Sequence, residues 1–553
     1  MFGLKGAYFY FIAIQITLIK FFKRIYFLSN HYNNSLRSKV PVKVNFNPNP
    51  FLLTLISPFS KKSFKLNEIN SSNFWIDDKN RKGLEDHNFL WLSLVDRKTD
   101  GKNIQKIIYL WILKYSTFKR RIWETSTLSA RVISWLLNID IIINNGSFDF
   151  KRKFFENIII QCNHLKKNIR FEKNPVKKIE ALTALIISGV IFKEYEDNYN
   201  TGIRGLQRFV KSFYDEDGFP LTRNFNDLIF FTKYLLLCYE NINDAQQYLP
   251  EFLDEIIKKN LNCIKSFQTP NNQTPLFNGT SENNLIPLEK YLEKTKANKK
   301  DKKYILGGVF FVKTRSQSLY FDVSAPPNKS FSKNYQSGPL SFEYFLDGKK
   351  IITNCGFGNN ISSKAELISR LTASQTTLTV NDTSITKFER NKLINRIFGN
   401  SIKNTFKTTD LKIKDEGKLI GCSALHNGYE KNFGCMHRRE VYLDRDNNKL
   451  KGVDYIMKKS DGIPIRYVFR FHLNPELSAV KTMSGNSALI QISKSRSLIF
   501  TVKEENLEIE KSIYLGGKKI LDNTCITISG NLVNKNKSFN WEIKKKLDNE
   551  SKN

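Results

Sequence analysis

The sequence predicts an all-helical part followed by an antiparallel β-sandwich. From about residue 100 to 270, apolar residues recur at helical spacing, most clearly over 181–192, 228–239 and 252–267. After the lysine-rich stretch 291–303 the period changes to two, and turns rich in Asp, Asn and Gly separate runs of Val, Ile, Phe and Tyr. A chain of 553 residues is also longer than a single domain usually grows.

The helical part divides at turn clusters such as 215–218 and 241–244. No strand-like alternation interrupts it, so we expect repeated antiparallel helix pairs over residues 101–290, with 291–303 as a linker. Residues 31–100 are expected to pack irregularly on these helices, with Trp75 and Trp91 as core anchors.

The β part, residues 304–548, contains two clear hairpin signals. One joins 340–345 to 350–355 through Asp347-Gly348, and the other joins 440–443 to 450–457. Roughly a dozen such strands are expected, and no helix between them is long enough to connect parallel strands. We therefore expect antiparallel sheets stacked face to face.

The formal net charge of +34 predicts an anionic partner. An acidic polysaccharide, an anionic lipid surface and a nucleic acid all fit this charge. The basic runs lack interleaved aromatic residues, and no helix-turn-helix, zinc finger or oligonucleotide-binding signature is present, so we expect no specific nucleic-acid partner. The seven cysteines are scattered without a CxxC pair, which argues against a disulfide framework and a cysteine zinc site.

Residues 1–30 form a basic, apolar N-terminal segment. The apolar stretch 7–19 is shorter than the ~20 residues that span a bilayer. Its length is typical of a signal peptide, but no small-x-small cleavage site follows it. A helix lying on an anionic membrane surface is an equal interpretation.

Several motifs occur in the order found in a known family. In the helical part these are Trp123 with Arg131 and Trp135, the run Asp-Gly-Phe-Pro-Leu-Thr-Arg-Asn at 217–224, and Leu-Phe-Asn-Gly at 276–279. In the β part they are 338–343 with 354–356, 370–378, 426–429 with 437–439, and 470–473. With these motifs the chain resembles the heparinase II/III polysaccharide lyases.

The resemblance implies an (α/α) toroid followed by an antiparallel β-sandwich. It also implies β-elimination on an acidic, uronate-containing polysaccharide, without a cofactor. The expected location is the bacterial cell envelope, periplasmic or membrane-peripheral, with the cytoplasmic side left open. The alternative is a non-catalytic protein for glycan binding or surface-polysaccharide assembly that has kept the lyase fold.

The chain departs from the family at its zinc ligands. The family's two histidines fall on Gln336 and Gln375, and its Asp or Asn before Cys-Gly falls on Asn354. Neutral amide oxygens bind zinc poorly, so we predict no metal. A candidate base of the family falls on Asn334, and its catalytic Tyr falls near Asp227.

Four residues are candidates for catalysis. Arg223 and Asn224 are suited to bind a uronate carboxylate. The alternative interpretation is a turn in which Asn224 caps a helix. His426 and Tyr429 offer a base and an acid, or they satisfy buried backbone groups.

Six further residues are candidates for substrate binding. Gln336 and Gln375 are candidates to bond sugar hydroxyls, or they pair with each other. Arg470 and His472 share one face of a strand, while Phe471 points to the other face. The six substrate-binding candidates are Gln336, Gln375, His437, Arg438, Arg470 and His472. Whether the chain turns over substrate, which sugar it takes and its oligomeric state do not follow from these residues.

Overall fold

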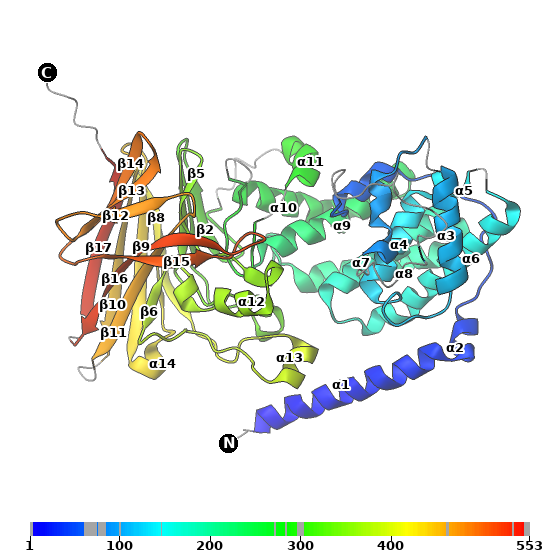
Figure 1. Ribbon diagram of the computed structural model, residues 1–553, viewed down its shortest axis with the longest axis horizontal. Coiled ribbons are helices and arrows are strands. Elements are labelled where there is room, and N and C mark those ends of the chain that lie inside the picture. The colour runs from blue at the N-terminus through cyan, green and yellow to red at the C-terminus, as the bar shows by residue number, and fades with distance from the viewer. Residues whose placement is uncertain are drawn as a thin grey trace. The chain divides into compact units, whose positions relative to one another are not determined.

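The computed structural model describes residues 4–59, 75, 85–98, 101–144, 146–269, 273–282, 285–295, 303–459, 464–533 and 536–546. Two compact units are present (Figure 1). The helical unit comprises Met1–Tyr214, Ile229–Leu261 and Ile286–Tyr291, and the β unit comprises Asp215–Leu228, Asn262–Leu285 and Leu292–Asn553. Most of the predicted lysine-rich linker, residues 296–302, lies outside the described residues.

The helical unit confirms the predicted helices. Its main elements are α1 (Leu4–Leu28), α2 (Asn30–Ser35), α3 (Gly101–Tyr115), α4 (Thr125–Leu137), α5 (Ile139–Ile143), α6 (Phe148–Asn168), α7 (Pro175–Ile191), α8 (Glu196–Phe213), α9 (Phe225–Asp244), α10 (Glu251–Phe267) and α11 (Glu289–Lys294). Trp75 and Trp91 are buried, as predicted, and so are Trp111, Trp123 and Trp135. Among the described residues, no helix combines the length and apolar character needed to cross a membrane.

Helix α7 lies at the centre of this unit and packs against α4, α6 and α8. It begins at Pro175, and the Asn174 side chain caps it by accepting a hydrogen bond from the Val176 N–H at 3.0 Å. Almost its whole circumference is buried, which explains why its sequence is nearly continuously apolar. Gly189 lets α7 approach α8 closely, because a Cβ atom there would lie 2.4 Å from the Tyr199 backbone nitrogen.

The β unit contains two antiparallel sheets, as predicted. The nine-stranded sheet has the order β1-β2-β3-β4-β5-β11-β16-β15, with β6 paired to β11. Its strands are β1 (Ile305–Leu306), β2 (Val309–Lys313), β3 (Gln317–Asp322), β4 (Phe342–Leu346), β5 (Lys349–Thr353), β6 (Leu378–Val380), β11 (Ile465–Leu473), β15 (Glu508–Tyr514) and β16 (Leu521–Leu532). The predicted hairpin around Asp347-Gly348 is the β4–β5 pair.

The eight-stranded sheet has the order β12-β13-β14-β17-β10-β9-β8-β7. Its strands are β7 (Thr408–Glu416), β8 (Leu419–His426), β9 (Cys435–Asp444), β10 (Lys449–Lys458), β12 (Ser478–Lys481), β13 (Ser487–Ser493), β14 (Arg496–Val502) and β17 (Asn536–Lys545). The second predicted hairpin is the β9–β10 pair. Three short helices, α12 (Ser363–Ser369), α13 (Lys392–Phe398) and α14 (Glu430–Phe433), lie between strands.

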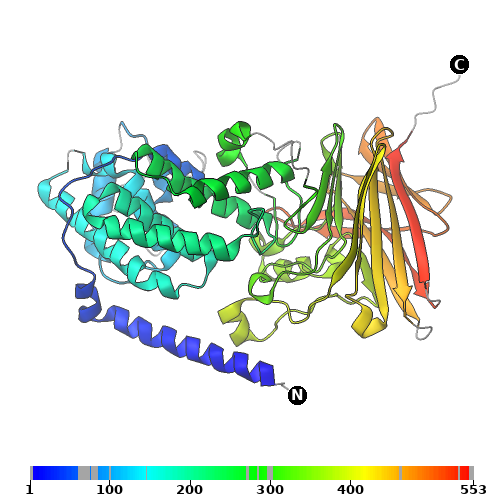
Figure 2. The same cartoon turned by 180° about the vertical axis from the view of Figure 1, so that it is seen from behind.

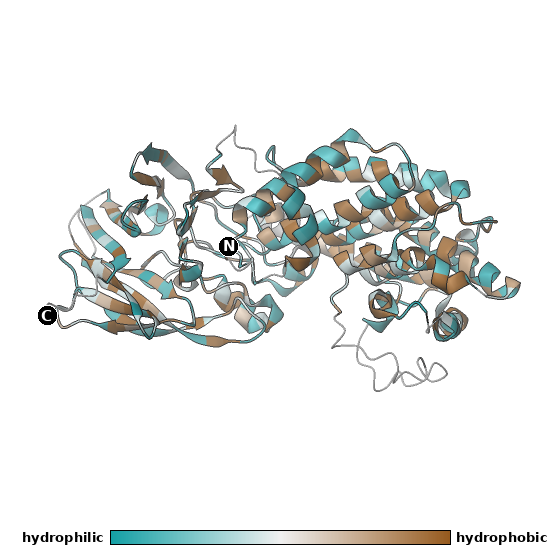
Figure 3. Cartoon of the chain, turned by 90° about the horizontal axis from the view of Figure 1, so that it is seen from above, coloured by the Kyte–Doolittle hydropathy of each residue, from teal (hydrophilic) through white to brown (hydrophobic). Residues whose placement is uncertain are grey.

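Aromatic side chains from both sheets form the core of the sandwich. Trp541 of β17 stacks on Phe342 of β4 at 5.3 Å between ring centroids and meets Phe471 of β11 at 5.1 Å. Polar and apolar residues alternate along the strands (Figure 3), so each sheet turns one face to this core. The predicted antiparallel sandwich is confirmed.

The β unit begins earlier in the chain than the predicted boundary. Residues 215–228 and 262–285 belong to it, and they include the start of α9 and the end of α10. Phe267 explains this assignment, because its ring packs against Phe311 of β2 and Tyr320 of β3 at 5.8 and 5.7 Å. Sequence periodicity marks where helices end, whereas the unit boundary depends on which side chains pack together.

We predict that Gly189→Ala lowers the free energy of unfolding by about 1–3 kcal/mol, because the added methyl group would force α7 and α8 apart. Gly101→Ala is the matched control, since a Cβ atom there comes no closer than 3.8 Å to its neighbours. Urea denaturation of both variants measures the difference. Equal stability of the two would contradict the close contact.

Candidate functional site

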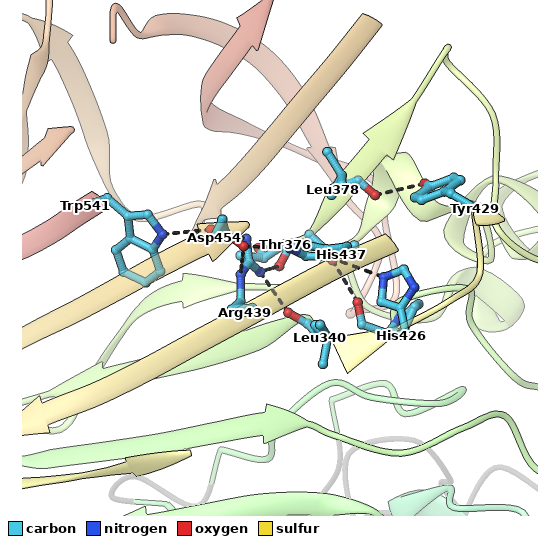
Figure 4. A network of polar contacts seen from close by, with 11 residues as sticks. Leu340, Thr376, Leu378, His426, Tyr429, His437, Arg439, Asp454 and Trp541 are labelled. Atoms are coloured by element: carbon cyan, nitrogen blue, oxygen red, sulfur yellow. Dashed lines mark hydrogen bonds and ion pairs between the residues drawn. The ribbon is translucent and has the colours of Figure 1, made fainter. Parts of the chain in front are cut away.

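A buried polar network lies between the two sheets (Figure 4). Asp454 of β10 is its centre and accepts hydrogen bonds from His437 Nε2 and Arg439 Nε, both at 2.7 Å, and from Trp541 Nε1 at 2.8 Å. His437 Nδ1 lies 3.3 Å from His426 Nε2, and His426 Nδ1 accepts from the Gly428 N–H at 3.1 Å. Since a carboxylate only accepts, this pattern assigns the Nε2–H tautomer to both histidines.

The network contains one compensated pair of charges. Burial alone raises the pKa of the Asp454 carboxyl, but the Arg439 charge and the bond from His437 lower it to about 2. Burial lowers the pKa of His426 well below its usual value, and it also lowers the pKa of His437. Both imidazoles are therefore neutral at pH 7, and the Asp454 carboxylate is balanced by Arg439.

Arg439 connects this pair to two loop segments. Its Nη1 donates to the Leu340 carbonyl at 2.8 Å and to the Thr376 carbonyl at 2.7 Å. Leu340 has a left-handed backbone with φ +56°, and Thr376 directly follows Gln375. The ion pair therefore holds in place the two segments that carry Gln336 and Gln375.

The structure corrects the predicted catalytic roles of His426 and Tyr429 and the binding role of His437. All three side chains are buried inside the sandwich. The Tyr429 hydroxyl donates to the Leu378 carbonyl at 2.9 Å. Because a polysaccharide cannot reach these groups, their role is to satisfy buried polar atoms, which was the alternative interpretation.

The residues at the zinc-ligand positions connect backbone segments. Gln336 Oε1 accepts from the Gly279 N–H at 2.9 Å, and its Nε2 donates to the carbonyls of Gly356 at 3.0 Å and Ser369 at 2.7 Å. Gln375 Nε2 donates to the same Ser369 carbonyl at 2.8 Å. The Asn354 amide binds the Thr376 N–H at 2.9 Å and the Leu276 carbonyl at 3.3 Å.

These residues do not fit zinc. Their amide groups bond to the backbone, and the described part of the chain has no group of three or more His, Cys, Asp or Glu side chains arranged to hold a metal ion. Gln336 and Gln375 are also buried, which contradicts the prediction that they bind sugar hydroxyls. They meet at the shared Ser369 carbonyl rather than bonding to each other.

The other basic candidates lie on different faces of the sandwich. Arg438 alternates with the inward-facing His437 and Arg439, so it lies on the outer face of the eight-stranded sheet, where it pairs with Glu440 at 2.9 Å. Arg470 lies on the outer face of the nine-stranded sheet and donates to Thr379 Oγ1 at 2.6 Å. These two arginines cannot contribute to one site.

His472 shares the face of Arg470, as predicted, while Phe471 points into the core. Its side chain is buried, however, and its ring nitrogens lie 3.0 Å from the Ala373 carbonyl and 3.1 Å from Ser512 Oγ. Burial lowers the pKa of His472 to about 4, so the ring is neutral at pH 7. The structure therefore corrects the prediction that His472 binds substrate, whereas Arg470 is partly exposed.

Arg223 and Asn224 lie in the turn before α9. Asn224 is buried, and its Oδ1 accepts from the Asn226 N–H at 2.8 Å, which is the helix-capping role that the sequence left open. Its Nδ2 donates to the Gly279 carbonyl at 3.3 Å. Arg223 has a left-handed backbone with φ +57°, is partly exposed and donates from Nη1 to the Ala325 carbonyl.

Around this turn the β unit gathers polar side chains that reach solvent. Arg223, Asp227 and Asn334 are partly exposed and Lys333 is exposed; we call these four residues the Arg223 cluster. Gly279 lies between its two segments, because a Cβ atom there would come within 2.6 Å of the Asn334 Cβ and 2.9 Å of Asn224 Nδ2. Residues 222–227 and 333–334 are therefore held against the same backbone turn.

Titratable groups in and beneath the cluster have shifted pKa values. Removal from water raises the pKa of Asp227 to about 6, against the opposing effects of its bond from Thr222 and the Lys333 charge. Burial raises the pKa of Asp322 to about 7, although the Arg223 charge opposes this. Tyr335 is buried beside both Asp322 and Arg223, and its hydroxyl has no hydrogen-bond partner among the described residues.

Sequence reasoning identified Arg223 but missed most of its neighbours. Asp227 and Asn334 were noted only as positions where family residues are replaced. Asp322 ends β3 and Tyr335 lies in a loop, and neither belongs to a spacing pattern that marks a site. Both lie near Arg223, which is about 100 positions earlier in the chain, so only the fold brings them together.

We predict that a chelator leaves the melting temperature unchanged, because amide side chains occupy the zinc-ligand positions. By contrast, Gln336→Ala should lower the stability by about 2–5 kcal/mol, because it removes the bonds of the buried Gly279 N–H and Gly356 carbonyl and opens a cavity. Thermal unfolding with and without the chelator, together with elemental analysis of the purified protein, checks both statements. Stoichiometric zinc that supports folding would contradict them.

We also predict that Asp454→Asn lowers the free energy of unfolding by about 3–5 kcal/mol, because Arg439 would remain buried without its counter-charge. Asp446→Asn is the control, since its ion pair with Lys418 is exposed and contributes less than about 1 kcal/mol. Denaturant titration at pH 7 compares the variants. A loss at Asp454 no larger than that at Asp446 would show that the network is dispensable.

Comparison with known proteins agrees with the resemblance seen in the sequence. Residues 297–542 match the family model described as heparinase II/III-like, C-terminal. No curated protein matches the chain at the level of sequence.

Solved structures extend the likeness over both units. The heparan sulfate lyase HepC from Pedobacter heparinus superposes with a TM-score of 0.64 at 16% identity, covering 90% of this chain and 82% of that one. A heparinase III gives a TM-score of 0.68 at 14% identity, covering 89% and 83%. A chondroitinase AC lyase gives 0.51 at 11% identity, covering 94% and 82%. The chain thus has the toroid and β-sandwich fold of these lyases, and its C-terminal half is a heparinase II/III-like domain.

Proposed function

We propose that the protein is a polysaccharide lyase that cleaves a uronate-containing chain by β-elimination at the Arg223 cluster. The observation that carries this proposal is the partly exposed group of two cations, one amide and one carboxyl in the β unit of a lyase fold. Heparan sulfate and chondroitin, named for the similar structures, are polymers of this acidic class. The net charge of +34 favours such a substrate.

Each member of the cluster has a chemical role in this proposal. Arg223 and Lys333 attract the uronate carboxylate, and the Asn334 amide hydrogen-bonds it, so that the negative charge developing on the adjacent carbon is stabilised. Asp227 accepts the proton from that carbon as a general base. The electron pair of the broken C–H bond forms the C=C bond, the glycosidic C–O bond breaks, and the same carboxyl returns its proton to the departing oxygen.

The pKa of about 6 for Asp227 suits both steps. At pH 7 most of the carboxyl is ionised and ready to accept a proton. Once protonated, it is acidic enough to give the proton to an alkoxide leaving group. Lys333 is the nearby cation whose charge keeps this pKa from rising further.

A specific observation also favours a second function, a glycan-binding or surface-polysaccharide assembly protein without catalysis. Asn334 stands where the family has a candidate histidine base, and no described histidine belongs to the Arg223 cluster. Binding requires only the cations and amides, whereas cleavage also requires Asp227. In either case we propose the cell envelope as the location.

Ultraviolet absorbance of the unsaturated uronate product tests the enzyme proposal. We expect product from at least one polymer in a panel of heparan sulfate, chondroitin sulfate and other uronate polysaccharides, and none from a neutral glycan. Arg223→Ala and Asp227→Asn should each lower kcat/KM by about 100-fold or more. The initial rate should rise with pH through about 6, because the base must be ionised.

Matched controls are Arg466→Ala and Asp382→Asn, which break an exposed ion pair on the same unit. Both should keep full activity. Thermal stabilisation by a uronate polymer without any product would support the binding protein instead. Neither product nor stabilisation across the panel would reject both functions.

A further inference from the structure

Helix α1 exposes a large apolar surface. Of the 25 exposed large hydrophobic side chains in the described structure, 10 lie on this one helix. They are Tyr10, Phe11, Ile14, Leu18, Ile19, Phe21, Phe22, Ile25, Tyr26 and Leu28. Isolated exposed hydrophobic residues are ordinary, whereas a contiguous group of this size marks an interaction surface.

These ten side chains lie along one side of α1. At 100° per residue they fall within about half of the helix circumference. Lys20, Lys23 and Arg24 fall on the other half, together with Ile12, Ala13, Ile16 and Phe27. The exposed half is therefore mainly apolar, and the basic residues lie on the other, cationic side.

The last turns of α1 attach it to the helical unit through the cationic side. Lys23 Nζ donates to Asn168 Oδ1 at 3.1 Å, and the Phe27 ring packs at 5.1 Å against both Phe118 and His164. Figures 1 and 2 show α1 as a long, straight helix that reaches the rest of the unit through α2. Because this side is used internally, the apolar half faces away from the unit that holds it.

The charge around this face identifies the partner. The first acidic residue of the chain is Glu68, so α1 and the segment after it carry positive charges only. Exposed Arg24 lies within about 40° of the edge of the apolar half, whereas exposed Lys20 lies near the centre of the other half. A second copy of α1 would bring like charges together at this border, which disfavours self-association. A lipid bilayer with an apolar interior and anionic headgroups matches both the exposed apolar half and the positive charge of this segment.

We propose that α1 docks in the plane of an anionic phospholipid bilayer. Its 25 residues make a rod of about 37 Å, and its aromatic and aliphatic half would enter the boundary between headgroups and acyl chains. Arg24 would contact lipid phosphates, and Lys20 would add a longer-range attraction to the anionic surface. This inference is independent of the chemistry at the Arg223 cluster, because it rests on a different unit and different residues.

Flotation of the full-length protein with vesicles tests this proposal. We expect the protein to float with vesicles that mix phosphatidylglycerol and phosphatidylcholine, and to stay in the soluble fraction with phosphatidylcholine alone. Lys20→Gln with Arg24→Gln should weaken binding by about 30-fold at low salt, because each basic residue near an anionic surface contributes roughly fivefold. Leu18→Gln with Phe22→Gln should weaken it by at least tenfold.

Val480→Gln with Val533→Gln is the matched control, since it removes exposed hydrophobic side chains from the β unit. This pair should bind vesicles like the unchanged protein. The melting temperature of each variant confirms that it folds. Equal binding to neutral and anionic vesicles, or no binding to anionic vesicles, would overturn the proposal. So would a protein that does not bind vesicles but forms a dimer that the Leu18 and Phe22 variant loses.

Discussion

The ion pair between Arg439 and Asp454 is the constraint on which much of the β unit depends. Transfer of two charges from water into a sandwich core is unfavourable unless each charge has its partners, and here the carboxylate accepts bonds from an arginine, a histidine and a tryptophan. The remaining guanidinium N–H groups reach the Leu340 and Thr376 carbonyls. One buried pair thus fixes both the relation of β9 to β10 and the segments that lead into β4 and β6. Such a network stabilises one arrangement over others, because any shift would leave a buried charge without a partner.

Polar residues in this protein separate into two groups with different uses. One group consists of residues that match the family motifs most closely, such as His426 and His437. These residues are buried and hold strands together. Of those that contact solvent, Asp227 and Asn334 stand where family residues are replaced, and Arg223 keeps its place in a family motif. Agreement with a family motif therefore identifies the fold here, but it does not by itself separate reactive groups from structural ones.

Most of the fold could be predicted from the sequence, because periodicity reflects burial. The apolar run in α7 records burial on nearly all sides, and the alternation in β9 records which face of the strand turns to the core. The site was harder to predict. Arg223 stood out through its motif, but Asp322 and Tyr335 lie near it only because of tertiary contacts. The burial of His472 depends on segments that pack over its strand. Solvent access is a property of the assembled unit, so residue identity alone could not separate the structural histidines from accessible ones. The assignment of residues 215–228 and 262–285 to the β unit was missed for the same reason.

The amide of Gln336 joins three backbone segments with a group that is part of the chain itself. An ion in this position would have to be captured from solution, so the population of folded molecules would depend on its concentration and on competing chelators. An amide has no proton to lose over the physiological range and no dissociation constant. Formation of this junction is therefore a unimolecular event that does not depend on the concentration of a metal ion.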